Sequence, residues 1–292
     1  MRFHLFIYLL LFCQLSYCQN QNYVDYYYPK INQAESFIVR KDYRKALITY
    51  NMVFNNTTNF FAKDIYNALI CSLLLKKNVN AKKFLNLLLI KGVDIHFLMK
   101  IPILNTFIKN NNREIYDRLK PISKDSTLIK FLEILEKKDQ EVRQIGVKLD
   151  CPLWVSDSSN AQSLINVIND IGFPNEDKIG FQGILPNEKL YMSIIMHQNQ
   201  LYRTFNFSEI LYEAVQKGAL LPNTALILMF FQSEDDNFGI VCDYQKISKM
   251  QYQKINNHRQ SWGVSDISQY AEKIQFSKKN RYFEFNLKQI EF

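Results

Sequence analysis

A helical hairpin is predicted by the stretch Ala34-Glu35-Ser36-Phe37-Ile38-Val39-Arg40-Lys41-Asp42-Tyr43-Arg44-Lys45-Ala46-Leu47-Ile48-Thr49-Tyr50. Its two alanines are small enough to sit where two helices cross closely, and its tyrosines fall on the packing face. A second copy begins at Ile65 and ends at Gly92. Its alanines, Ala68 and Ala81, follow the first pair by 34 and 35 positions. Self-similarity at such a fixed period indicates stacked helical units.

A period near 34 residues is that of the tetratricopeptide repeat, which this pattern resembles in size and in the placement of small residues. Two repeats alone bury too little apolar surface to be stable, so a further helical unit is expected. Residues 101–119, interrupted by Pro102 and closed by Pro121, are the candidate. The resemblance implies a tetratricopeptide-like region over residues 19–122 that either binds a protein partner or supports the second half as a scaffold.

Composition favours helices throughout the chain. The 292 residues are 47% hydrophobic and 22% charged, as in an ordinary globular protein, and only 8 Gly and 7 Pro stand against 22 Phe and 17 Tyr. Few turn residues and many apolar ones indicate a mainly α fold. Residues 123–292 are expected to form an α-rich domain in which residues 239–244 and 282–287, which have strand-like composition, pair as a small β-ribbon.

The N-terminus predicts export. Arg2 precedes an apolar run that is too short to span a bilayer, and small residues follow at Ser16 and Cys18. We expect residues 1–18 to be a signal peptide and the mature chain to begin at Gln19. The alternative is a lipoprotein signal that anchors the protein through Cys18. No later run is apolar enough to cross a membrane, so the protein is expected to be periplasmic or secreted, with no transmembrane segment after cleavage.

Charge and cysteines add weaker information. The formal charge of +8 is spread over lysine doublets on helix faces, which indicates a solvated surface; an exported protein rarely meets nucleic acid, so no nucleic-acid partner is expected. Cys71 lies in an apolar helical run and is interpreted as a small buried side chain. Cys151 and Cys242 are a candidate disulfide in an oxidising compartment, and the sequence leaves open whether they pair.

In the second half, Ser126 is a candidate cap for a helix that continues past Asp139, which places Arg143 one turn further on the same face. A helix over residues 159–171 is closed by Gly172 and Pro174. A third helix starts near residue 187, and the spacing of its apolar residues turns His197 inward. Such a histidine is either a core residue with hydrogen-bond partners or a catalyst. Two short helices are predicted over residues 208–217 and 223–232.

Several short motifs resemble an uncharacterised bacterial domain family. They are Asp139-Gln140-x-x-Arg143, Gly172-Phe173-Pro174 followed by Gly180, a helix with His197, and Asn256-x-x-Arg259. The family pattern has Asp-Gln-x-x-Arg, Gln-His-Ala-Asp, Tyr-Gly-Thr-Gln and Asn-x-x-Arg in this order, and the family is often joined to tetratricopeptide-like helices in exported proteins. The match covers residues 126–275. It implies an architecture and candidate positions, because the family has no established reaction.

The chain departs from this pattern in two places. Met196-His197-Gln198-Asn199 replaces Gln-His-Ala-Asp, and Phe238-Gly239-Ile240-Val241 stands in place of Tyr-Gly-Thr-Gln. An activity that used those polar groups would be weakened here.

Two functions remain open. The sequence has no H-E-x-x-H or G-x-S-x-G motif, no clustered His/Cys set and no Gly-rich nucleotide loop, so neither a metal nor a cofactor is expected. The first hypothesis is a non-enzymatic, protein-binding or scaffold protein. The second is an enzyme or small-ligand binder with Asp139 and His197 as catalytic candidates and Arg143 and Arg259 as binding residues. Under either hypothesis we expect Asp139 and His197 to lie within one hydrogen bond or one water of each other, with Arg143 nearby.

Overall fold

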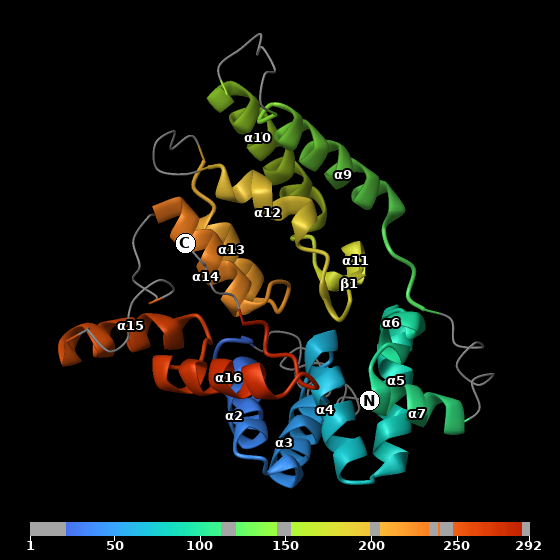
Figure 1. The fold of residues 1–292 in the computed structure, drawn as a ribbon. Helices are drawn as coiled ribbons and strands as arrows, with labels where there is room; N and C mark the ends of the chain where they lie inside the picture. Colours follow the sequence, from blue (N-terminus) through green and yellow to red (C-terminus); the bar gives the residue numbers. More distant parts are fainter. Residues whose placement is uncertain are drawn as a thin grey trace, which may run out of the picture.

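The computed structural model describes residues 22–111, 121–144, 153–198, 205–233, 239 and 248–287. Its first helices form two successive hairpins, α2 (Tyr27–Val39) with α3 (Tyr43–Asn56) and α4 (Ala62–Leu74) with α5 (Asn78–Lys91) (Figure 1). Helix α3 also packs against α4, so the hairpins stack. The four alanines that defined the repeat, Ala34, Ala46, Ala68 and Ala81, are all fully buried. The predicted helical hairpins and their spacing are confirmed.

Local signals set the hairpin boundaries. The Asp42 side chain accepts a hydrogen bond from the backbone N–H of Lys45 and so caps α3. Gly92 ends α5 in a left-handed conformation with φ of +92°, which a residue with a Cβ rarely adopts.

A third helical unit follows the two hairpins. Among the described residues it consists of α6 (Ile95–Met99) and α7 (Pro102–Asn110); residues 112–120, the rest of the predicted unit, lie outside them. Pro102 begins α7 instead of interrupting a longer helix, because a proline at the first helical position gives up an N–H that has no intrahelical partner.

The second half is also helical, which confirms a mainly α fold. It comprises α9 (Ser126–Glu141), α10 (Leu153–Ile171), α11 (Glu176–Ile179), α12 (Lys189–Met196), α13 (Ser208–Gln216), α14 (Pro222–Ser233), α15 (Lys249–Ser261) and α16 (Ile267–Lys279). Helices α9, α10 and α12 pack against one another. None of the helices described is both long and apolar enough to cross a membrane.

Several predicted boundaries are corrected. Asp125, not Ser126, caps α9, and this helix ends before Arg143. Helix α10 begins at Leu153, earlier than residue 159. Helix α12 ends at Met196, so His197 occupies its C-cap. Gly172 has a φ of +76° directly after α10, as predicted.

The small β-ribbon is present but lies elsewhere in the chain. Strands β1 (Phe181–Gln182) and β2 (Leu185–Pro186) pair antiparallel, with Phe181 opposite Pro186. The predicted position of the ribbon is wrong, because residues 282–287 form no strand. The other predicted strand, residues 239–244, lies outside the described residues except for Gly239.

The C-terminal segment returns to the N-terminal hairpins. Helix α16 packs on α2, and the ring of Phe283 stacks on Tyr43 at 5.7 Å between centroids. The Asn67 side chain on α4 donates to the carbonyl of Glu284 at 2.6 Å and accepts from its N–H at 3.0 Å. One hydrophobic core therefore contains residues from both sides of position 122, the predicted domain boundary.

Candidate functional site

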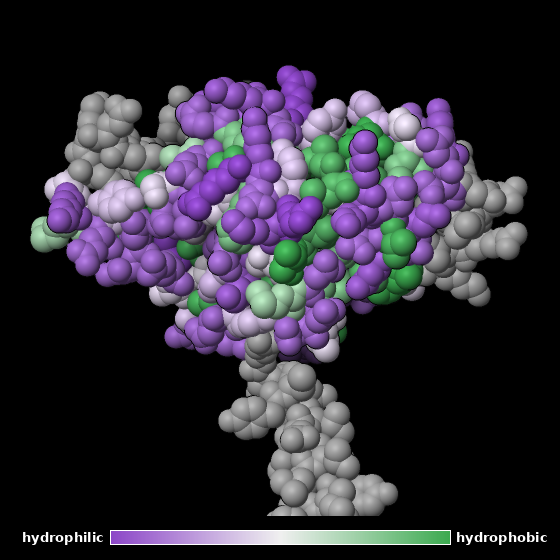
Figure 2. Space-filling view, turned by 90° about the horizontal axis from the view of Figure 1, so that it is seen from below, coloured by the Kyte–Doolittle hydropathy of each residue, from purple (hydrophilic) through white to green (hydrophobic). Residues whose placement is uncertain are grey.

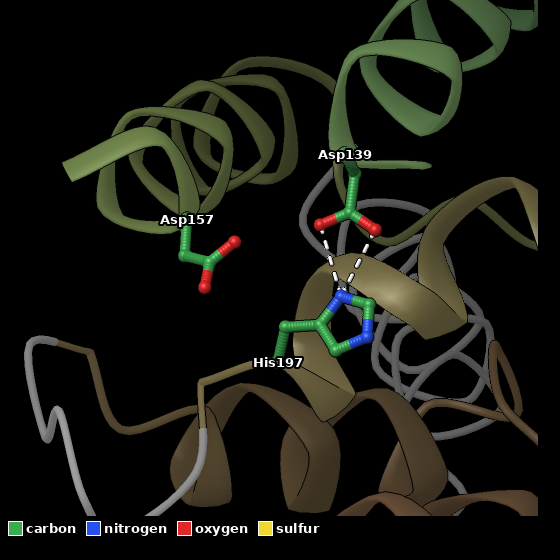
Figure 3. A group of neighbouring side chains, drawn as sticks. All are labelled: Asp139, Asp157 and His197. Atoms are coloured by element: carbon green, nitrogen blue, oxygen red, sulfur yellow. Dashed lines mark hydrogen bonds and ion pairs between the residues drawn. The ribbon is translucent and has the colours of Figure 1, made fainter. Parts of the chain in front are cut away.

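Asp139 and His197 meet where the C-terminal ends of α9 and α12 converge. The Nδ1 atom of His197 lies 3.0 Å from Oδ1 and 2.9 Å from Oδ2 of Asp139, whereas Nε2 points away from the carboxylate (Figure 3). The Asp139 side chain is fully buried, and that of His197 is 30% exposed. The predicted contact is confirmed, although His197 reaches it from a helix cap at the edge of the core.

Arg143 bridges two carboxylates. Its Nη1 donates to Oδ1 of Asp139 at 3.2 Å and to the Asp139 carbonyl at 2.6 Å, and its Nη2 donates to Oδ1 of Asp157 at 2.5 Å. Because Arg143 lies just beyond the end of α9, its side chain can turn back over the last turn and reach α10. The contact between Asp139 and Arg143 is therefore one half of a three-residue bridge, and the Asp139 carboxylate is fully buried.

Sequence reasoning missed three polar residues of this cluster. Asp157 on α10 is only 3% exposed; the Gln198 side chain donates to its carbonyl at 2.9 Å, and the Gln140 side chain donates to Oδ2 of Asp139 at 2.9 Å. A signal was present for Asp157. It lies on the same helical stripe as Asn160, Ala161 and Leu164, and all four residues are buried.

Two buried carboxylates face one guanidinium in this cluster. Removing such charges from water costs several kcal/mol per ion unless hydrogen bonds and opposite charge compensate. Asp139 receives hydrogen bonds from three side chains, His197, Arg143 and Gln140, so each of its oxygens has a partner.

These residues do not suit a resident metal ion. Ligand atoms of Asp139, Asp157 and His197 lie within 4.8 Å of one another, which a divalent ion could bridge. Arg143 already donates to both carboxylates from between them and so supplies the positive charge that an ion would bring. A metal would have to displace the guanidinium.

Arg259 is not brought to this cluster. Its Nε donates to the carbonyl of Ser265 at 2.7 Å, and its guanidinium lies 4.7 Å from the centre of the Tyr270 ring. Arg259 lies on α15, Tyr270 on α16 and Ser265 between the two helices, and both helices lie well apart from α9 and α10 (Figure 1). Of the four residues in the pocket hypothesis, the structure brings three together.

The cysteine prediction is not addressed by the structure. Cys151 and Cys242 lie outside the described residues. Cys71 is a free thiol, fully buried on α4, and its burial raises the pKa of the thiol. It packs as the small apolar side chain that was expected.

A second buried cluster of charges was missed altogether. Lys63 on α4 contacts Glu35 of α2 at 2.7 Å and Asp64 at 2.5 Å, and Lys273 of α16 contacts Glu35 at 2.5 Å. All four side chains are at most 6% exposed. Burial raises the pKa of Asp64, whereas two ammonium groups outweigh burial and lower the pKa of Glu35. These ion pairs connect α16 to α2, and α2 to α4.

No protein-family model, curated protein or solved structure matches the chain. The resemblances to the tetratricopeptide repeat and to the uncharacterised bacterial domain family therefore stay predictions.

Proposed function

We propose that this chain is an exported, non-enzymatic scaffold that binds a protein partner through its N-terminal hairpins. The first support is that the Asp139 cluster is used within the chain. Asp139 and Asp157 both form ion pairs with Arg143, and His197, at the C-terminal end of α12, contacts Asp139. Such a network joins three helices by mutual hydrogen bonds. Its carboxylates and guanidinium are already occupied and offer no ready site for a substrate.

The second support comes from the surfaces that remain. Helix α4 is buried from Ala62 through Ser72, and the inner side of the hairpins is covered by α16 and residues 283–286. A partner cannot lie across that side without displacing the C-terminal segment. Of the residues that the structure describes, Tyr282 alone in the C-terminal segment lines the groove on the outer side, around the α4–α5 turn and α7, which leaves this side for binding.

The observation that carries the proposal is an apolar groove on this outer side. Its volume is about 570 Å³. Its lining combines six apolar or aromatic residues with four polar ones: Leu73, Leu74, Pro102, Ile103, Phe107 and Tyr282 with Asn78, Thr106, Asn110 and Asn111. Leu74 is 36% exposed, and Val79 in the next helix is 83% exposed. Figure 2 views the molecule from below and shows hydrophobic side chains gathered on one side of this face among hydrophilic ones. Grouped apolar residues rimmed by polar ones are typical of protein-binding sites.

The test is site-specific photo-crosslinking in the cells that make the protein. A photoreactive amino acid is placed at Leu74 or at Thr106, which both line the groove, and in a matched control at exposed Lys137 on α9. We expect a discrete protein adduct from the two groove positions and none from the control. Adducts of equal yield from all three positions, or none from any, would overturn the proposal. Unchanged melting temperatures show that each variant is folded.

A second function is favoured by one specific feature, the orientation of His197. A buried carboxylate fixes Nδ1, and the described residues make no hydrogen bond to Nε2 in a side chain that is 30% exposed. This is the arrangement of a general base, which needs an oriented imidazole with one accessible nitrogen. The alternative function is therefore hydrolysis or proton abstraction at Nε2, with Asp139 as the orienting residue.

This alternative is tested with an activated ester, p-nitrophenyl acetate, as the probe. General-base use of His197 predicts release of nitrophenolate above the buffer rate, lost in His197→Gln and reduced in Asp139→Asn. The exposed His96 on α6 gives the control, His96→Gln, which should react like the parent protein. If all four proteins hydrolyse the ester equally, the alternative is rejected.

A further inference from the structure

We propose that the partner segment that enters the outer groove is acidic and apolar, a stretch of protein with leucine- or phenylalanine-like anchors beside Asp or Glu side chains. This inference rests on the proposed function and adds the chemistry of the partner to it. It is carried by the charge around the groove and by the shape of the groove.

The chain around the groove contains no acidic residue over long stretches. None occurs in residues 65–93, which include most of α4 and all of α5, and none in residues 95–111, which include α6 and α7. The exposed lysine doublets of this region therefore have no acidic neighbours along the chain. This differs from an ordinary solvated helix face, where both signs are interspersed.

Exposed cations flank the groove at several points. Lys76 and Lys77 lie between Leu74 and Asn78 of its lining, Lys109 precedes Asn110, and Arg281 precedes Tyr282. All four are exposed. An apolar floor with a rim of one sign attracts a ligand of the opposite sign, speeds its encounter and excludes basic competitors.

The nearest carboxylate in the C-terminal segment does not neutralise this rim. The Oε1 atom of Glu284 accepts a hydrogen bond from the backbone N–H of Asn286 at 2.7 Å, and the Glu284 backbone is clamped by Asn67. One residue, Phe283, separates Glu284 from Tyr282, the C-terminal member of the groove lining, and the Glu284 carboxylate is already used in a local turn.

The shape favours a protein segment over a membrane surface. Membrane-binding faces bury apolar side chains that project into the lipid. Here the apolar side chains line a hollow of about 570 Å³, within the range of small-molecule pockets and large enough for a few anchoring side chains. A helix or extended segment that inserts its apolar residues between α4 and α7 would place its own acidic groups against the lysines.

The experiment is selection of a displayed library of random peptides on the immobilised protein. We expect the enriched peptides to combine Asp or Glu with Leu, Ile or Phe. Binding of a synthetic enriched peptide should weaken about tenfold or more in Lys76→Glu/Lys77→Glu, because the reversal turns two attractive charge pairs into repulsive ones. It should also weaken as salt is added.

The control is Lys137→Glu/Lys138→Glu, which reverses the same number of charges at an exposed doublet on α9, away from the groove. It should bind the peptide like the parent protein. Enriched peptides that are neutral or basic and that still need the groove would overturn the acidic partner and leave the proposed function standing. No enrichment at all would count against both. Binding to vesicles of anionic phospholipid, lost in the Lys76→Glu/Lys77→Glu variant, with no enriched peptide, would replace the protein segment by a membrane surface.

Discussion

Truncation of His197 tests whether the Asp139 cluster holds the C-terminal helices together. In His197→Ala, the buried carboxylate of Asp139 loses its contact with Nδ1 and keeps those from Arg143 and Gln140. The direct link from α9 to α12 through this cluster is then broken. We expect a less stable protein with an unchanged helical fold.

The magnitude follows from the burial of the two partners. A hydrogen bond to a charged group contributes about 1.5–3 kcal/mol. The Asp139 side chain is fully buried, but that of His197 is 30% exposed, so water can replace part of the lost contact. We expect the free energy of unfolding to fall by about 1–2 kcal/mol, which lowers the melting temperature by about 2–6 °C for a chain of this size.

The assay is urea and thermal denaturation followed by circular dichroism. His197→Gln keeps a donor and an acceptor and should lose less than half as much stability as the alanine variant. A double-mutant cycle isolates the contact: in an Asp139→Asn background, the cost of His197→Ala should fall to about 0.5 kcal/mol or less. His96→Ala, at an exposed histidine, is the control and should unfold like the parent protein.

Two results would refute this reasoning. An unchanged melting temperature for His197→Ala would mean that the contact adds nothing to stability, and would shift the weight of evidence to the general-base alternative. Equal costs of His197→Ala in the parent and Asp139→Asn proteins would mean that the histidine stabilises the fold through other groups.

Three more predictions follow from the buried charges and the leader. Burial raises the pKa of Glu176 from 4.5 to about 7, although its Oε1 atom lies 3.1 Å from Nζ of Lys91. Folding therefore favours the protonated carboxyl group. The stability that this preference contributes is complete below pH 4.5 and is lost as pH rises through 7. The free energy of unfolding, measured by urea titration, should therefore fall less between pH 5 and pH 8 in Glu176→Gln than in the parent. Equal falls would contradict this sign. Glu35→Gln leaves the buried Lys273 without its carboxylate partner and should lower the free energy of unfolding by about 3–5 kcal/mol in the same assay. Adding Lys273→Met should restore much of this loss. No recovery in the double variant would exclude the unpaired charge as the cause. Mass spectrometry of the exported protein should find Gln19 at the N-terminus, and an intact Met1 would contradict the signal peptide.

Much of the helical architecture could be read from local patterns. Spacing of small residues at Ala34, Ala46, Ala68 and Ala81 predicted the two hairpins, because close helix crossings tolerate only small side chains. Gly172 marked the end of α10, because its positive φ is accessible to glycine at little cost. The contact of His197 with Asp139 was also predicted: an inward imidazole needs a hydrogen-bond partner, and the motifs that resemble the bacterial domain family contain both residues.

The tertiary structure alone decided which other distant residues join Asp139 and His197. Asp157 enters the cluster because α10 starts earlier than its apolar stripe suggested and lays its first turns beside Arg143. Arg259 is excluded because its helix turns back on α16 and engages Ser265 and Tyr270.

The path of the C-terminal segment was likewise outside the reach of local patterns. Lys273 meets Glu35 only because α16 returns across α2, over a separation of 238 positions. Periodicity and capping report on neighbours one or two turns away, so they fix helices and their ends. Partners so far apart in the chain are fixed by how the helices pack around a common core, which no local pattern encodes.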